Sequence, residues 1–255
     1  MMAGSTSTSP WGQPDRSETG RQPRLLQGPQ QFSFDILRIE LPSDQAEHSR
    51  KVWNHVDEMR IDADASVRLA RNGIRIGVAG QASWPAIEAI ARSVGGTISS
   101  TSLASGGAIP VSLALADVQG SETVFVHDTR SGLKGRTFHR GQKVLTFTGW
   151  SEAEIAAGIR VGVEFEIRHE SGDLTWQRAQ DGIQAVPMVD RQVFEELTNS
   201  TLLGPGDILL IGPNHDVEHA FLLGGKYFEI TREGRRKDVV ICLTAGRINT
   251  DRSES

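Results

Sequence analysis

Short runs in which apolar and polar residues alternate dominate the sequence from residue 109 onward, and they constrain the fold more than any other feature. In the clearest run, every second residue from Val161 to Ile167 is apolar, and the residues between them are glycine or glutamate. A period of two places the apolar side chains on one face of a strand. Similar runs recur about every ten residues, separated by turn signals such as Asp181-Gly182. This spacing predicts a mainly antiparallel, sandwich- or barrel-like β-rich domain over residues 109–248.

Residues 32–96 have a different pattern. The run FSFDILRIEL at 32–41 has apolar residues at both odd and even positions, which predicts a strand with a bulge. A helix ending near Ile61 is predicted from apolar residues at three- and four-residue spacing (Val52, Trp53, Val56 and Met59). Two further helices, each closed by glycine, are predicted on either side of a strand at 74–78. The region therefore predicts a small β-α-α-β-α domain, and the whole chain predicts the α+β class.

The remaining segments predict tails and a linker. Residues 1–31 are rich in Ser, Thr, Gly, Pro and Gln, and they carry too few large apolar residues to offset the entropy of ordering a chain. They predict a disordered tail, and residues 249–255 predict a second tail. Residues 97–108 contain Gly and Ser but no charged residue, and they predict a linker between the two domains, with an edge strand as the alternative for the same stretch.

The composition excludes several classes of protein. The chain has 27 basic and 32 acidic residues, so its net charge is −5, and both signs are dispersed. Nucleic acid is therefore not an expected partner. The single cysteine, Cys242, excludes an internal disulfide, and its run VVICL is typical of a buried strand. No Cys/His array has the spacing of a structural zinc site, so the main expectation is a fold without a cofactor.

The sequence also carries an expectation about location. Residues 1–31 lack the basic start and apolar core of a secretory signal, and no run of about 18 apolar residues occurs. The expected compartment is therefore the cytoplasm. If the true start lies upstream of Met1, the cell envelope becomes the expected location, so the sequence leaves membrane association open.

One motif supports an alternative, enzymatic function for the protein. His215, Glu218 and His219 match H-x-x-E-H, in which two histidines on one helix face bind zinc and the glutamate activates water. The motif lies between strand-like runs, so these residues fit a polar connecting loop as well. A third ligand would have to come from elsewhere, with His169, Glu170 and Asp190 as candidates by residue type alone. The alternative function is a metal-dependent hydrolase.

A second cluster supports an interaction role. Four basic residues, Arg232, Arg235, Arg236 and Lys237, are interleaved with acidic residues in a predicted turn. Such a charged tip ordinarily keeps edge strands from pairing with other molecules. A docking site for an acidic partner is the alternative interpretation of the same residues.

The order of features in residues 205–248 resembles the end of the bacterial secretin domain. The matches are glycines at turns, apolar strand residues and a few polar positions (Gly206, Ile211, Gly212, Leu223, Gly224, Phe228, Arg232, Asp238, Thr244, Arg247 and Ile248). Secretins form large multisubunit pores for protein or pilus export. The resemblance therefore implies a homo-oligomeric secretion or pilus component without a cofactor. Because no catalytic motif has both the right spacing and the right context, we expect a non-catalytic assembly or protein-interaction component.

Overall fold

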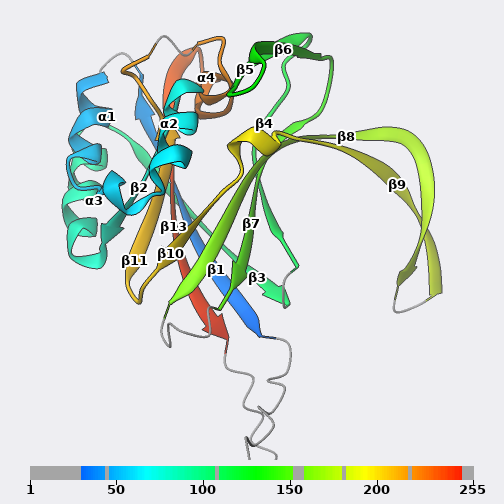
Figure 1. Ribbon diagram of the computed structural model, residues 1–255, viewed down its shortest axis with the longest axis horizontal. Helices are drawn as coiled ribbons and strands as arrows, with labels where there is room; N and C mark the ends of the chain where they lie inside the picture. The colour runs from blue at the N-terminus through cyan, green and yellow to red at the C-terminus, as the bar shows by residue number, and fades with distance from the viewer. Residues whose placement is uncertain are drawn as a thin grey trace, which may run out of the picture.

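The structure is a computed structural model of the chain, and it describes residues 30–43, 46–106, 109–151, 158–179, 182–217 and 220–248. In these residues, a six-stranded and a five-stranded antiparallel sheet pack face to face, and a long hairpin projects from the second sheet (Figure 1). This arrangement confirms the predicted α+β class with mainly antiparallel strands. The helices and strands in chain order are β1 (Gln31–Pro42), α1 (Ala46–Trp53), α2 (Ala63–Arg71), β2 (Ile74–Gly80), α3 (Trp84–Ser93), β3 (Thr97–Gly106), β4 (Val111–Asp117), β5 (Glu122–Asp128), β6 (Gly132–Phe138), β7 (Gln142–Trp150), β8 (Ile159–Ala179), β9 (Gly182–Val193), β10 (Asn199–Leu203), β11 (Asp207–Pro213), α4 (Leu223–Phe228), β12 (Glu229–Arg232) and β13 (Arg235–Ile248).

The first sheet has the order β2-β11-β13-β1-β3, with β12 paired to β13. The interior strand β1 pairs with both of its neighbours, β13 and β3, in continuous register, so the predicted bulge is wrong. Apolar residues occur at both even and odd positions of β1 because both faces of the strand are covered. Phe32, Phe34 and Ile36 face the second sheet, whereas Ile39 and Leu41 face the helices.

The helices α1 and α3 cover the outer face of the first sheet (Figure 1). Trp53 of α1 and Ile87 of α3 pack there against buried strand residues, including Cys242 of β13. The other core lies between the sheets, where Phe34 of β1 contacts Phe147 of β7 with ring centroids 6.4 Å apart. No helix in the described part of the chain is long and apolar enough to span a membrane.

The stretch predicted as a linker, residues 97–108, contains an edge strand of the first sheet. Residues 97–106 form β3, and every residue of β3 pairs with a residue of β1. In addition, β1 and β2 share their sheet with β11 and β13 from the C-terminal part. The 32–96 region and the 109–248 region therefore share one sheet, because partners distant in sequence complete it. The predicted tails lie outside the described residues, apart from Gln30 and Gln31, and Gln31 already begins β1.

Two local predictions also differ from the structure. The first helix ends at Trp53, because Asp57 bridges to Val78 and its side chain accepts a hydrogen bond from the Met59 N–H. Met59 is consequently 92% exposed and is not part of an apolar stripe. The run KYFEITR at 226–232 predicts a strand, but residues 223–228 form the short buried helix α4, and β12 begins only at Glu229. That run is too short for its period to separate a helix from a strand.

The thiol of Cys242 gives a first testable expectation. Complete burial raises its pKa to about 12 and also blocks access to reagents. Iodoacetamide at pH 8 should therefore leave Cys242 unmodified in the folded protein and alkylate it in urea, as measured by mass spectrometry. Modification of the native protein at the rate of the unfolded chain would contradict the buried position.

Candidate interaction surfaces

The hairpin of β8 and β9 extends well beyond the sheet that anchors it. The neighbouring strand β7 pairs with β8 only as far as Arg168, and from there to Ala179 β8 pairs with β9 alone. Eleven residues at about 3.3 Å each correspond to roughly 35 Å of strand. Figure 1 shows this ribbon curving away from the rest of the molecule. We refer to residues 169–190 as the arm; residues 180 and 181 at its tip lie outside the described residues.

One face of the arm is apolar and exposed. Leu174 and Trp176 occupy alternate positions of β8 and are 65% and 72% exposed. Ile183, also 72% exposed, lies two residues from Ala185, which pairs directly with Trp176. Residues two apart on a strand and residues directly opposite share a face, so all three large side chains lie on one side of the ribbon. Nothing in the described residues covers them.

The root of the arm is held by a buried carboxylate. Glu166 is fully buried, its Oε2 lies 2.6 Å from Arg191 Nε, and its Oε1 contacts Arg168 and the Thr146 hydroxyl. Burial opposes the charged form, but hydrogen bonds from Thr146, Arg191 and Arg168 outweigh it and lower the pKa of Glu166. This network joins β7, β8 and β9 at the point where the arm leaves the sheet, so the root is anchored to the body.

The four predicted basic residues gather at the β12–β13 turn. Arg236 forms an ion pair with Glu229 at 2.5 Å, and the Glu40 carboxylate forms ion pairs with both Arg232 (3.5 Å) and Lys237 (3.3 Å). The fourth, Arg235, is exposed and has no carboxylate partner among the described residues. Three of the four predicted interaction residues are therefore already in ion pairs.

A hollow of about 670 Å³ lies beside this turn. Its lining includes Pro42, Ser43, Gly95, Arg232, Arg235 and Lys237. Buried Glu40 takes part in the turn's ion pairs. Desolvation raises its pKa, but the Lys237 hydrogen bond and the charges of Arg38, Lys237 and Arg232 outweigh that effect and lower it. Glu40 therefore remains a carboxylate at neutral pH and holds two of the basic side chains in place.

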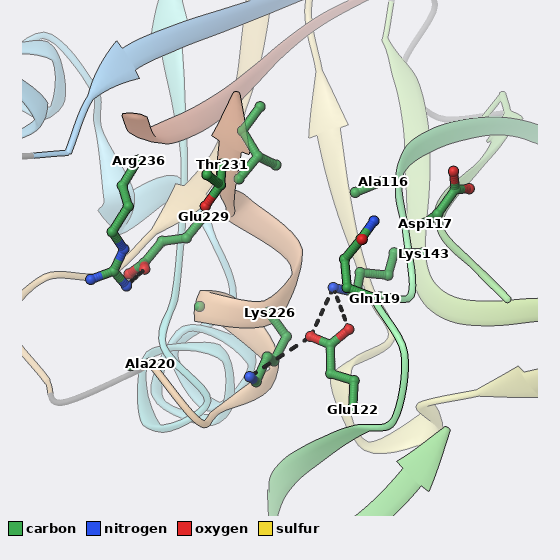
Figure 2. A pocket seen from close by; sticks show the side chains of 12 residues that line it. Ala116, Asp117, Gln119, Glu122, Lys143, Ala220, Lys226, Glu229, Thr231 and Arg236 are labelled. Carbon is green, nitrogen blue, oxygen red and sulfur yellow. Dashed lines mark hydrogen bonds and ion pairs between the residues drawn. The ribbon is translucent and has the colours of Figure 1, made fainter. Parts of the chain in front are cut away.

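A second hollow, of about 510 Å³, lies between α4, β4, β7 and β12 (Figure 2). The Glu122 carboxylate lies between Lys143, at 2.9 Å, and Lys226, at 3.8 Å, while Arg236 points to Glu229. The cations are matched by nearby carboxylates, so this cluster ties α4 to β5 and β7. Sequence analysis did not identify Glu122 and Lys143, because they are 21 residues apart on different strands and belong to no motif.

The structure places only one residue of the H-x-x-E-H motif. His215 lies in a turn after β11, and its Nε2 is 2.7 Å from Asp238 Oδ2; Glu218 and His219 lie outside the described residues. Of the suggested third ligands, His169 and Asp190 pair with each other on the other sheet, and the side chain of Glu170 is not described. In the described residues, no group of three His, Cys, Asp or Glu side chains is arranged to hold a metal ion. Nothing there favours the hydrolase.

Comparisons with known proteins give only weak similarity. No family model matches the chain, and no curated protein does. Among solved structures, the InvG secretin domain beta-barrel from the Salmonella SPI-1 injectisome NC-base is similar with 13% sequence identity and a TM-score of 0.26. The match covers 89% of this chain and 64% of that one, so the chain spans less than two thirds of that structure. A similarity this low does not show membership of any family.

Proposed function

We propose that this protein is a non-catalytic assembly subunit that associates with further copies of itself through the arm. The observation that carries the proposal is the exposed apolar face formed by Leu174, Trp176 and Ile183 on a projecting two-stranded ribbon. A two-stranded hairpin by itself is only marginally stable in water, and an exposed apolar patch commonly marks an interaction site. The secretin resemblance of residues 205–248 favours a subunit of a secretion or pilus complex within this proposal.

A second copy of the chain fits the arm better than an unrelated partner. Beyond Arg168, the outer edges of both β8 and β9 pair with no strand in the described residues. When two arms lie side by side, the β9 edge of one runs antiparallel to the β8 edge of the next, and their apolar faces point the same way. Such a contact uses two different edges, so it is heterologous and extends to a ring or a filament of copies.

The charge of the arm predicts how this association responds to salt. Residues 169–190 contain four acidic residues and one arginine, which gives 1 − 4 = −3 with histidine neutral. Neighbouring arms therefore repel one another, and salt screens that repulsion. Association should tighten between about 0.05 M and about 0.5 M NaCl. An arm that instead docked on the basic turn of another copy would bind more weakly as salt rises.

The test is the oligomeric state of the full chain, measured by size exclusion with light scattering. We expect wild type to form complexes larger than a monomer and the double variant Trp176→Ser/Ile183→Ser to associate at least about 100-fold more weakly, since each apolar side chain contributes roughly 1.5–3 kcal/mol on burial. Both residues are exposed in the free chain, so the variant should unfold at the wild-type temperature. Circular dichroism measures the unfolding temperature of both proteins.

A matched control replaces two exposed apolar residues outside the arm. Met59→Ser/Val67→Ser removes side chains that are 92% and 52% exposed and should leave assembly unchanged. The proposal fails if wild type stays monomeric at high protein concentration, or if the arm variant and the control assemble equally well.

A further inference from the structure

The β12–β13 turn contains a pair of like charges that the fold itself does not require. Arg232 and Arg235 are directly opposite each other in the register, as the last pair before the turn at Glu233 and Gly234. Like charges at directly opposite positions destabilise a hairpin. The turn fixes this placement, because both of its residues have positive φ, 53° and 74°.

The surrounding carboxylates compensate only part of this positive charge. Among the described residues, these ion pairs and the lining of the hollow contain five cationic side chains, counting Arg38, and three carboxylates (Glu40, Glu229 and Glu233), which leaves a surplus of two. The guanidinium of Arg235 is the one left without a carboxylate among the described residues. Glu40 holds the side chains of Arg232 and Lys237 in place through its ion pairs. Their positive charges therefore stay close to the guanidinium of Arg235.

One residue that lines the adjoining hollow has a hydroxyl group without a partner among the described residues. Ser43 lines it and is held in place by its backbone N–H, which donates to the Arg236 carbonyl at 3.2 Å. The Ser43 Oγ is buried and has no hydrogen-bond partner in the described part of the chain. A buried hydroxyl normally has a partner, since leaving it without one costs about 1–3 kcal/mol. A ligand in the hollow would supply that partner.

We infer that this hollow binds a small molecule through an oxyanion, either a phosphate or a carboxylate group. Arg235 is the main ligand, because its guanidinium offers parallel N–H donors that match two oxygens of such a group. Arg232 and Lys237 add positive charge, and the Ser43 hydroxyl donates a further hydrogen bond. The second hollow has no such surplus, since its three cations, Lys143, Lys226 and Arg236, are matched by three carboxylates, Asp117, Glu122 and Glu229. This site is independent of assembly through the arm.

The experiment is isothermal titration calorimetry of the full chain at low ionic strength, with inorganic phosphate and succinate as separate probes. We expect one saturable site per chain, with Arg235→Gln weakening binding about fivefold to tenfold and Ser43→Ala about twofold to threefold. The control is Arg130→Gln, which removes an exposed arginine from another hairpin turn and should leave the affinity within about twofold of wild type. Arg235 is exposed, so its replacement should not change the unfolding temperature.

The two probes separate the two sources of the oxyanion. Tighter binding of phosphate assigns the site to phosphorylated molecules, and tighter binding of succinate assigns it to carboxylates; both support the site if Arg235→Gln weakens the binding. The inference is overturned if neither probe binds saturably, or if Arg130→Gln weakens binding as much as Arg235→Gln. The second result would mean that the probes respond to overall surface charge.

Discussion

Replacing Gly224 with alanine is expected to destabilise the folded protein by about 4 kcal/mol or more, or to prevent folding. Gly224 lies in α4, where its N–H donates to the Asn72 carbonyl at 2.9 Å. A Cβ at this position would meet the backbone oxygen of Gly73 at 1.9 Å and its carbonyl carbon at 2.3 Å. Both distances are far shorter than any real contact, so one of the two segments would have to move.

The backbone at Gly73 has little freedom to move. Gly73 closes α2 with a φ of 73°, and its carbonyl accepts a hydrogen bond from the Asn214 N–H at 2.9 Å. Asn72 is fully buried, and its side chain bonds to the carbonyl and the N–H of His127 in β5. A shift at Gly73 would therefore disturb α2, β5 and the end of β11 together.

Chemical denaturation of purified variants measures this effect. Glycine to alanine within a helix ordinarily stabilises by about 0.5–1 kcal/mol, so the expected sign is opposite to that of helix propensity. The control is Gly80→Ala, where nothing lies within 4 Å of the new Cβ and φ is −79°. Gly80→Ala should leave stability unchanged or slightly increased. A Gly224→Ala variant as stable as wild type would show that α4 does not pack against residues 72–73.

Replacing Glu166 with alanine is expected to cost about 3 kcal/mol of folding free energy. The substitution removes the carboxylate that Arg168, Arg191 and the Thr146 hydroxyl share, and it leaves the two guanidinium groups facing each other at the root of the arm. Their partial exposure, 27% and 43% of the side chains, keeps the cost at the lower end of the range for breaking a buried pair. Thermal and urea denaturation measure the loss.

Glu164→Ala is the matched control for this prediction. Glu164 lies two residues away on the same face of β8, and it has no ion pair with another described residue. Its replacement should change stability by less than about 0.5 kcal/mol. Equal losses for the two variants would mean that the network at the arm root does not contribute to stability.

The same carboxylate predicts a pH dependence. In the folded protein the pKa of Glu166 lies below its ordinary value of 4.5. Its stabilising contribution is therefore fully present above about pH 4.5 and is lost as the pH falls through the lower, folded pKa. Below pH 4.5, wild-type stability should fall more steeply with acid than that of Glu166→Ala, and the two curves should run parallel between pH 5 and 7. A constant gap throughout the acid range would contradict the assignment.

Local patterns predicted many individual elements. The alternation from Val161 to Ile167 corresponds to the buried half of β8, and Gly73 and Gly95 close α2 and α3 with positive φ, as the helix-stop signals predict. These features depend on the conformational preferences of neighbouring residues, which a linear sequence carries directly. Helix α2 lies directly before the strand at 74–78 and is closed by Gly73, as the sequence predicts, since its apolar positions and its closing glycine lie within one short segment.

The candidate sites could be predicted only in part. The sequence identified the basic turn, because its four cations are neighbours in the chain. It did not show that Glu40, about 190 residues away, holds two of them, or that Ser43 lies beside them. The apolar residues of the arm alternate like those of any strand, so their pattern cannot show that β7 ends at Arg168 and leaves them without a covering sheet.

The sequence by itself determined that the protein is an α+β chain rich in antiparallel strands, that Cys242 is buried and that one turn is strongly basic. Tertiary structure alone decided that β1, β3 and β13 join in one sheet, that Gly224 touches Gly73 and that the arm stands apart from the body. The physical reason is that secondary structure reflects periods of two to four residues, whereas strand pairing, ion pairs and exposure depend on which distant segments meet in space.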